Sequence, residues 1–486
     1  MMHEFCTPKR NLSFRRNHVK FGAGAKFSQD SSRMTNRRRL NFQWYNTLAV
    51  SANLRNPNNP FIKLIVIGFG KIVLFSLISC NHEDFPSHHL FRATSAETVS
   101  SPAVYDFDRD GRLEIVLASF DGFCYLVDDS LRDLPNWPQP VAGGVFSSPT
   151  LWDIDGDQQP EIFIGGNDGA LHGWHFNGSA VTGFPIALGY RLWSSPVMIA
   201  DSLLAIGGRE QMHVFDRRGK PAPGWPQSMR GWAMATPAWH EDLLVITTLT
   251  LGDASRGYVY AWHLSGELYP NFPVHLPMDA PASPSLADLN GDGRVEIIAG
   301  DEAGFLHVLQ LDGSELPPFP RLVGKGIHSN PVIVDLNRDG KLDIIFGTTD
   351  GAVHAWNSTG DCLLGWPVRT GYEINSSPAL IMLYEHRYGL IIGGGDGLLH
   401  GFDAGGQIIP GFPLSCGAEV SSSPMVVDLD GNGRREIVVG AHNGIHVIRD
   451  LLPSANGAIQ LLEWPMFRRN LQRTGSPILQ KNFTKD

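Results

Sequence analysis

The sequence predicts an all-β protein, a β-propeller of eight four-stranded blades, with seven blades as the alternative. Three observations support this prediction. The chain has 486 residues, including 53 Gly and 33 Pro, and this composition indicates many turns and short strands. A Ser-Pro type pair recurs, with its proline at positions 102, 149, 196, 237, 284, 331, 378 and 424. An acidic loop of nine residues follows five of these pairs.

The unit that begins at Ser283-Pro284 shows how each blade is expected to form. A strand opens at this pair, and the acidic loop connects it to a second strand over Glu296–Gly300. A turn leads to a third strand, Phe305–Leu309, and another turn leads through Phe319-Pro320 to the fourth. Four strands joined by such turns make one antiparallel blade.

The acidic loops have the ligand pattern of a calcium site. The first runs from Asp106 to Glu114, with carboxylates at positions 1, 3, 5 and 9 and Gly111 at position 6. Alternate residues of a tight turn point to a common centre, the glycine permits the left-handed backbone of such a turn, and calcium prefers oxygen ligands. The sequence therefore predicts about five calcium ions as cofactors. The predicted ligands are Asp106, Asp108, Asp110 and Glu114; Asp153, Asp155, Asp157 and Glu161; Asp288, Asn290, Asp292 and Glu296; Asp335, Asn337, Asp339 and Asp343; and Asp428, Asp430, Asn432 and Glu436.

Over residues 101–475 the repeat resembles the FG-GAP/VCBS repeats, which form the calcium-loop propellers of integrin alpha chains. The motifs that carry the resemblance are Ser-Pro, then Asp-x-[Asp/Asn]-x-Asp-Gly-x-x-[Asp/Glu]-Ile, then Gly-x-x-Asp-Gly. The segment Trp464–Gly475 also looks like the tryptophan segment of quinoprotein-type propellers, so we expect it to form the fourth strand of the last blade. Phe91–Ser100 is the alternative for closing the ring.

The N-terminal part predicts an exported, lipid-anchored protein. Residues 1–60 hold 11 basic residues and two acids, typical of a disordered leader that is absent from the mature protein. Residues 61–80 read as a signal peptide that ends in Leu77-Ile-Ser-Cys80, which resembles the lipobox of bacterial lipoproteins, with Cys80 as the lipidated residue. Residues 81–100 would be a tether, and 476–486 a tail.

The alternative for this segment is an uncleaved membrane anchor with a basic cytoplasmic arm. Both readings place residues 81–486 outside the cytoplasm, at a bacterial outer membrane or cell surface, or secreted. Residues 61–486 carry 28 basic and 47 acidic residues, and this acidic balance argues against a nucleic-acid partner. The remaining cysteines, Cys124, Cys362 and Cys416, are expected to be buried and unpaired.

Two further positions recur and are expected to be structural. A histidine in the third strand recurs once per blade, which separates these side chains too far to share one ion. An aromatic residue before proline recurs at one phase of each unit, which indicates packing between blades, with stacking on sugars as the rival interpretation. The histidines are His172, His213, His307, His354, His400 and His446, and the aromatic residues are Trp137, Phe184, Trp225, Phe272, Phe319, Trp366, Phe412 and Trp464.

The residues of the connections that lead into the Ser-Pro pairs differ from unit to unit. This variation predicts that the connections form the binding face. Variable polar and aromatic residues on a constant scaffold are typical of a ligand site. The predicted face comprises Arg191, Trp193, Arg230, Trp232, His328, Tyr372 and Glu373. We found no catalytic motif, so we expect a surface-exposed, calcium-binding module that binds an extracellular protein or glycan. The alternative is an enzyme that acts on carbohydrate, such as a calcium-dependent polysaccharide lyase, in which Arg191, His328 and Glu373 would cluster.

Overall fold

The computed structural model describes residues 88–250, 256–383 and 387–449, together with the backbone of three strands nearer the N-terminus. The chain divides into two units, Met1–Asn81 and His82–Asp486. In the first unit, β1 (Ala49–Asn56), β2 (Asn59–Phe69) and β3 (Ile72–Ser79) form an antiparallel sheet in the order β1-β2-β3. The expected lipidation site, Cys80, lies outside the described residues, and so do most of the leader and the tail.

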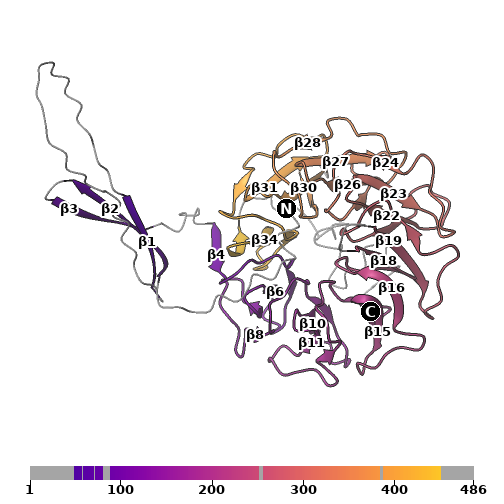
Figure 1. Ribbon diagram of the computed structural model, residues 1–486, viewed down its shortest axis with the longest axis horizontal. Coiled ribbons are helices and arrows are strands. Elements are labelled where there is room, and N and C mark those ends of the chain that lie inside the picture. Colours follow the sequence, from indigo (N-terminus) through magenta and orange to yellow (C-terminus); the bar gives the residue numbers. More distant parts are fainter. Residues whose placement is uncertain are drawn as a thin grey trace, which may run out of the picture. The chain divides into compact units, whose positions relative to one another are not determined.

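The second unit is a ring of eight four-stranded antiparallel sheets, so the eight-bladed propeller is confirmed (Figure 1). Blade one contains β5 (Ala103–Tyr105), β6 (Glu114–Ser119), β7 (Phe123–Val127) and β8 (Gln139–Pro140). Blade two contains β9 (Thr150–Trp152), β10 (Glu161–Gly165), β11 (Ala170–Trp174) and β12 (Ile186–Ala187). Blade three contains β13 (Val197–Ile199), β14 (Leu203–Gly207), β15 (Arg209–Asp216) and β16 (Gln227–Trp232). Blade four contains β17 (Ala238–His240), β18 (Leu243–Thr248), β19 (Tyr258–His263) and β20 (Val274–His275).

The remaining blades repeat this order. Blade five contains β21 (Ser285–Ala287), β22 (Glu296–Gly300), β23 (Phe305–Leu309) and β24 (Arg321–Leu322). Blade six contains β25 (Val332–Val334), β26 (Asp343–Gly347), β27 (Ala352–Asn357) and β28 (Val368–Arg369). Blade seven contains β29 (Ala379–Met382), β30 (Tyr388–Gly393), β31 (Leu398–Asp403) and β32 (Leu414–Ser415). Blade eight contains β33 (Met425–Val427), β34 (Glu436–Ala441), β35 (Gly444–Ile448) and β4 (His89–Ala93).

The ring is closed by β4, which runs antiparallel to β35 and pairs Leu90 with Val447. The expectation that Trp464–Gly475 supplies this fourth strand is therefore corrected, because β4 occupies its place. The alternative, that residues 91–100 close the ring, is confirmed in part, because β4 includes Phe91, Arg92 and Ala93. Trp464 itself lies outside the described residues.

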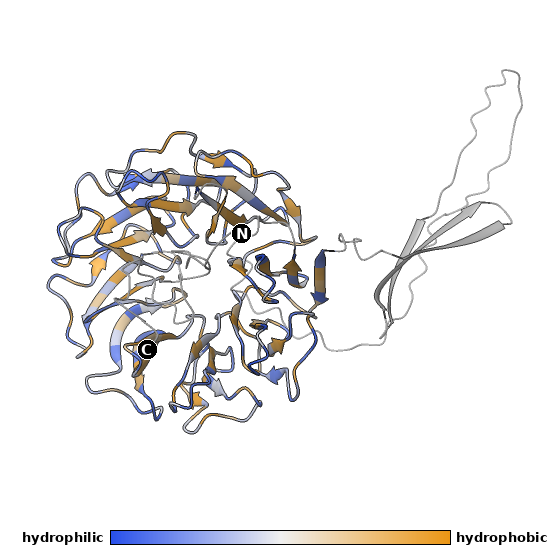
Figure 2. Ribbon diagram, turned by 180° about the vertical axis from the view of Figure 1, so that it is seen from behind, coloured by the Kyte–Doolittle hydropathy of each residue, from blue (hydrophilic) through white to orange (hydrophobic). Residues whose placement is uncertain are grey.

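Residues of high hydropathy, orange in Figure 2, are frequent in the strands of the blades. The second strands are buried on both faces, as in β22, where all five residues are buried. Neighbouring blades therefore share one continuous core, which explains why these strands read as unbroken apolar runs rather than as alternating patterns. No helix among the described residues is long and apolar enough to span a bilayer.

The Ser-Pro pairs form a ring of hydrogen bonds around the inside of the propeller. The backbone N–H of Ser101 donates to Ser148 Oγ at 2.9 Å, and the N–H of Ser148 donates to Ser195 Oγ at the same distance. From blade four onward the same bond recurs, with Thr236 and Asn330 in place of serine, and the N–H of Ser423 donates to Ser101 Oγ at 2.9 Å, across the point where the ring closes. The serine is therefore an acceptor for the preceding blade, and it satisfies a buried backbone donor there.

The recurring aromatic residues pack between blades, as expected. The seven that are described, from Trp137 to Phe412, are all buried. The Trp137 indole N–H donates to the backbone oxygen of Phe176 in the next blade at 2.7 Å, and Trp366 bonds Ala404 in the same way at 3.0 Å. Burial leaves no room for stacking on sugars, so the packing interpretation is confirmed for these residues.

The histidines of the third strands lie on separate blades, and His213 bonds Tyr190 on the connection that leads into its blade. His172 and His400 each contact an aspartate four residues earlier, Asp168 and Asp396, at 2.9 Å. His446 instead contacts His89 across the ring-closing pair of strands, also at 2.9 Å. The cysteine expectation is correct for Cys124 and Cys416, but Cys362 is exposed because it lies in the turn between the third and fourth strands of blade six.

Candidate metal sites and binding face

All five complete acidic loops join the first and second strands of a blade, and their backbones are held by the same set of hydrogen bonds. In each loop the acid at position 9 accepts the N–H of residue 2, and the bond lengths lie between 2.7 and 2.9 Å. The aspartate at position 1 accepts the N–H of residue 6 at 2.9 to 3.1 Å. Residue 6 has a positive φ in every loop described, and in blade two Gln158 takes the place of glycine with a φ of 69°.

These bonds use one oxygen of each position-9 acid and leave the other for the loop centre. Glu436 shows this arrangement: its Oε2 accepts the Leu429 N–H at 2.7 Å, whereas its Oε1 has no hydrogen-bond partner among the described residues. Asp343 Oδ1 is likewise buried without a partner. A buried carboxylate oxygen without a donor is costly, and a cation at the loop centre would satisfy it.

In three of the five loops, three acidic side chains each bring one oxygen close to the others. One oxygen from each of Asp106, Asp108 and Glu114 lies within 4.8 Å of the others, and the blade-eight group of Asp428, Asp430 and Glu436 is equally compact. In blade two, the group Asp153, Asp155 and Asp157 satisfies the same limit.

In blades five and six an asparagine stands at position 3, and its amide faces the acids. Asn290 Nδ2 donates to Glu296 Oε1 at 2.9 Å, and Asn337 Nδ2 donates to Asp339 at 3.2 Å. The oxygen of each amide accepts a backbone N–H of its own loop, that of Asp292 at 2.8 Å and that of Asp339 at 2.9 Å. The side chains at positions 1, 3, 5 and 9 of the loops are carboxylates and amides, the ligand type that calcium takes.

The electrostatics of the loops favour the same ion. Burial, together with the neighbouring aspartates, raises the pKa of Glu114 and of Glu436 from 4.5 to about 7. The same causes raise the pKa of Asp343 from 3.8 to about 6, and the pKa values of Glu161 and Glu296 are also raised, chiefly by burial. Clustered acids that resist ionisation are stabilised in their charged form by a bound cation.

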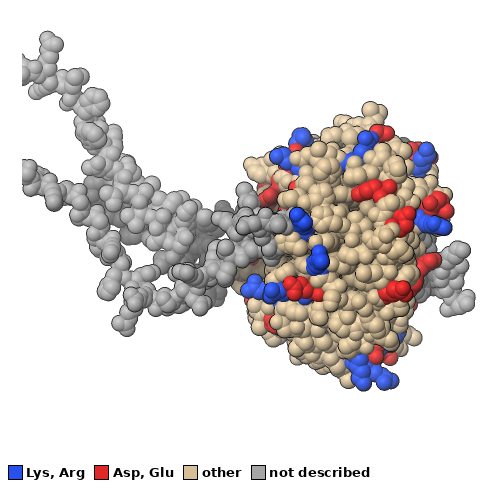
Figure 3. All heavy atoms as spheres, turned by 45° about the vertical axis from the view of Figure 1, so that its right-hand side comes forward, with Lys and Arg blue, Asp and Glu red and all other residues tan. Residues whose placement is uncertain are grey.

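The opposite end of the blades carries the connections that lead into the first strands. The turn between the second and third strands lies against this connection in successive blades: Asn167 N–H donates to Gly144 at 3.1 Å, and Glu302 N–H donates to Asp279 at 2.8 Å. We call this side the connection face and the other side the acidic-loop face. Acidic and basic side chains are interspersed on the side of the ring shown in Figure 3.

An arc of aromatic side chains runs along the connection face from blade one to the end of blade three. Successive ring centroids are 6.1 Å apart for Phe120–Phe146, 6.5 Å for Phe146–Trp193 and 5.0 Å for Trp193–Trp232. The guanidinium of Arg209 lies 5.2 Å from the centre of the Trp232 ring, in cation–π geometry. All four rings are half-buried, so each presents part of its surface to solvent. We call these residues the aromatic arc.

The structure brings together only part of the predicted face. Trp193 and Trp232 are in contact, whereas Arg191 is exposed and Arg230 lies over Tyr258 at 6.0 Å. Phe120, Phe146 and Arg209 belong to the arc but were not predicted to bind.

The other predicted residues lie on the connections that follow blades five and six. His328 contacts Asn375 at 3.1 Å and Glu302 at 3.7 Å. Tyr372 is 60% exposed, and Glu373 accepts the Gly395 N–H through its backbone oxygen. Among the described residues, no hydrogen bond or ion pair links Arg191, His328 and Glu373.

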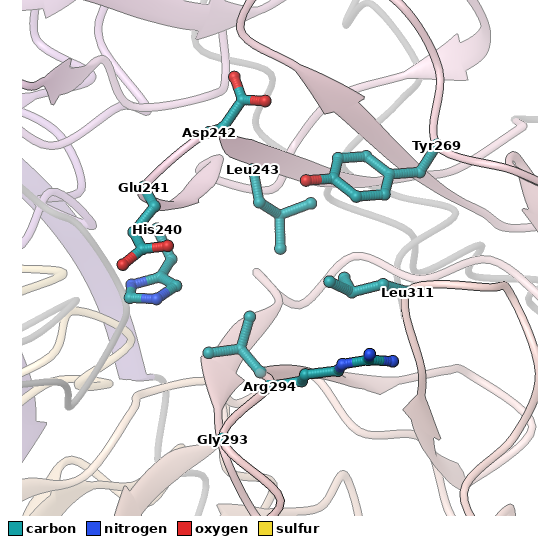
Figure 4. A pocket seen from close by; sticks show the side chains of 9 residues that line it. His240, Glu241, Asp242, Leu243, Tyr269, Gly293, Arg294 and Leu311 are labelled. Carbon is teal, nitrogen blue, oxygen red and sulfur yellow. The ribbon is translucent and has the colours of Figure 1, made fainter.

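A small hollow lies on the acidic-loop face between blades four and five (Figure 4). Its walls include Tyr269 and Leu243 on one side and Leu311 and Arg294 on the other. Its volume of about 180 Å³ is below the about 300–1,000 Å³ of most small-molecule sites. We therefore assign it no role in binding an extended ligand.

Comparison with known proteins supports the fold. No protein-family model matches the sequence, and no curated protein matches it. The structure is similar to the computationally designed Ika8 protein, with a TM-score of 0.55 and 14% sequence identity over 74% of this chain and 98% of that one. It is also similar to BamB from Moraxella catarrhalis, with a TM-score of 0.43 and 16% identity over 74% of this chain and 98% of that one. At 14% identity the likeness to Ika8 concerns the fold alone.

Proposed function

We propose that this chain is a calcium-binding β-propeller of the FG-GAP/VCBS type, exposed at the cell surface, that binds an extracellular protein or glycan on its connection face. The observation that carries the proposal is the separation of two kinds of residue. The acidic loops repeat from blade to blade on one face, whereas the aromatic arc occurs once, on the other. A repeated feature serves the scaffold, and an unrepeated patch of aromatic and arginine side chains is typical of a binding anchor.

Calcium has a structural role in this proposal. Each ion would be held by the acids of one loop and would fix the connection between the first two strands. The loops then stay rigid when the carboxylates are ionised, and the ring presents the opposite face as a firm platform. An anchor at Cys80, or an uncleaved span in its place, would hold this platform at the membrane.

A double substitution of the arc tests the proposed binding face. Trp193→Ala with Trp232→Ala removes the closest ring pair, and we expect it to abolish binding to the probes that the wild-type chain binds on a glycan array or a panel of extracellular proteins. The cost in stability should be about 2–4 kcal/mol, because the two half-buried rings lose packed apolar area in addition to the about 0.5–1.5 kcal/mol of the ring pair itself.

Asp292→Ala is the matched control on the acidic-loop face. It should lower the melting temperature more than it lowers affinity, because Asp292 accepts the Arg294 N–H at 2.8 Å and belongs to an acidic loop. Unchanged binding by the tryptophan variant would refute the assignment of the face. Unfolding of that variant would show that the two rings belong to the core.

A further inference from the structure

The acidic loop of blade two has a nitrogen ligand beside it. Strands β10 and β11 pair Ile162 with Trp174, so the next pair along the ladder is Glu161 with His175. His175 Nδ1 lies 3.0 Å from Glu161 Oε1. The matching residues opposite the other four loops are Asp128, Gln310, Asn357 and Arg449. A histidine therefore stands at this position in only one of the five complete acidic loops, all of which are described.

The geometry of this group suits a single metal ion. Asp155, Glu161 and His175 each offer one ligand atom, and these atoms all lie within 4.8 Å of one another. Glu161 is 2% exposed and is fixed by the Ile154 N–H, which its Oε2 accepts at 2.9 Å. Two ligand atoms each about 2.1 Å from a tetrahedral zinc ion lie about 3.4 Å apart, so the 3.0 Å between Glu161 Oε1 and His175 Nδ1 would open by about 0.4 Å when the ion binds.

We propose that Asp155, Glu161 and His175 form a site for a first-row transition-metal ion of the Zn²⁺ class. Imidazole nitrogen suits zinc, copper and nickel, whereas calcium and magnesium prefer ligands that are all oxygen. Asp155 and His175 both retain exposed surface, which leaves the open side of the ion to water. The inference uses the loop geometry of the proposed calcium sites, but it depends on His175 and not on calcium.

Zinc binding in the presence of excess calcium tests the proposal. The full chain, freed of any affinity tag and stripped of metal, is dialysed against calcium and titrated with Zn²⁺ by calorimetry, and bound metals are then counted by elemental analysis. We expect one zinc ion and about four calcium ions per chain, because zinc would take Asp155 and Glu161 from the proposed calcium site of blade two. His175→Asn, which copies the asparagine that blade six carries at the matching position, should weaken zinc binding at least about 100-fold, since even outer-shell substitutions cost 10–100-fold. Co²⁺ should give an absorption band that the variant lacks.

His263→Asn is the matched control. His263 holds the same register position in blade four, opposite Leu243, and its Nδ1 lies 2.7 Å from Asp242. This variant should bind zinc like the wild type.

Two results would overturn the inference: no zinc bound by the wild type in calcium, or zinc retained by His175→Asn, which would make His175 a hydrogen-bond partner of Glu161 only. About five calcium ions without zinc would contradict this inference alone. Zinc bound without calcium would contradict the proposed calcium sites alone.

Discussion

Glu436→Gln is expected to change the stability of the propeller in opposite directions with and without calcium. Glu436 is fully buried, and one of its oxygens accepts the Leu429 N–H at 2.7 Å. Glutamine has the same shape, and its amide oxygen can accept this hydrogen bond. The substitution therefore removes the charge and one metal ligand with little change in packing.

The magnitude follows from the pKa of the carboxyl. Burial, together with Asp430 and Asp428, raises the pKa of Glu436 from 4.5 to about 7, and this shift corresponds to about 3 kcal/mol. The pKa of Glu436 is higher in the folded state than in the unfolded state. The stabilisation that comes from the protonated carboxyl is therefore fully present below pH 4.5 and is lost as the pH rises through 7. In chelator at pH 8 the ionised carboxylate thus destabilises the fold, and Glu436→Gln should recover about 1–3 kcal/mol of the free energy of unfolding.

With calcium, Glu436→Gln is expected to lower the free energy of unfolding instead of raising it. A site filled at 100 times its dissociation constant stabilises the fold by about 2.7 kcal/mol, and the variant should lose most of this. Urea unfolding at pH 8, with calcium and with chelator, measures both effects, and at pH 4.5 in chelator the two proteins should be equally stable. Glu267→Gln, an exposed position outside the acidic loops, should change stability by less than about 0.5 kcal/mol in either condition. Destabilisation by Glu436→Gln in both calcium and chelator would refute the reasoning, since it would make the charge itself structural.

Three further outcomes are expected. Elemental analysis of the chain in calcium should find about five ions, and one ion or none would contradict the loop assignment. Cys80→Ser should move the protein from the membrane fraction to the soluble fraction, whereas unchanged membrane association would favour the uncleaved anchor. Ser195→Ala should lower the free energy of unfolding by about 1–3 kcal/mol, because it leaves the buried Ser148 N–H without its acceptor, while the exposed Ser228→Ala should change it by less than about 0.5 kcal/mol; equal losses would contradict the role of the serine ring.

The sequence predicted the blades well because their signals are local. The period of the Ser-Pro pairs, the acidic loops and the turns all lie within one repeat, so each copy supports the others. Gly111 at position 6 has a φ of 89°, as a left-handed turn residue should. Trp137 and its equivalents were also interpreted correctly, because one aromatic residue at one phase reflects a repeated contact.

The features that the sequence did not predict depend on distant contacts. β4 carries no repeat motif, and it pairs with a strand more than 350 residues later in the chain, so the Trp464 segment with its matching motif was preferred. The hydrogen bonds between the Ser-Pro pairs join residues 47 positions apart. The sequence shows that these pairs recur at this interval, but it does not show that they bond to one another. His175 was missed because it follows the third strand, out of phase with the recurring histidines. Its position opposite Glu161 in the strand register was the signal that would have found it.

The closure by β4 has a mechanical consequence. Among the described residues, His88 and the five paired residues of β4 make the first contacts with the ring along the chain from the N-terminal side, and Thr94 and Thr98 bond blade eight only after them. A force applied to the chain on the N-terminal side of β4 therefore acts on the hydrogen bonds between β4 and β35 before it acts on any complete blade. Blade eight would separate from β4 first, and the Ser423–Ser101 bond across the same junction would be the next to bear tension. The segment that would tether the ring is thus also the one whose release converts a closed ring into an open arc.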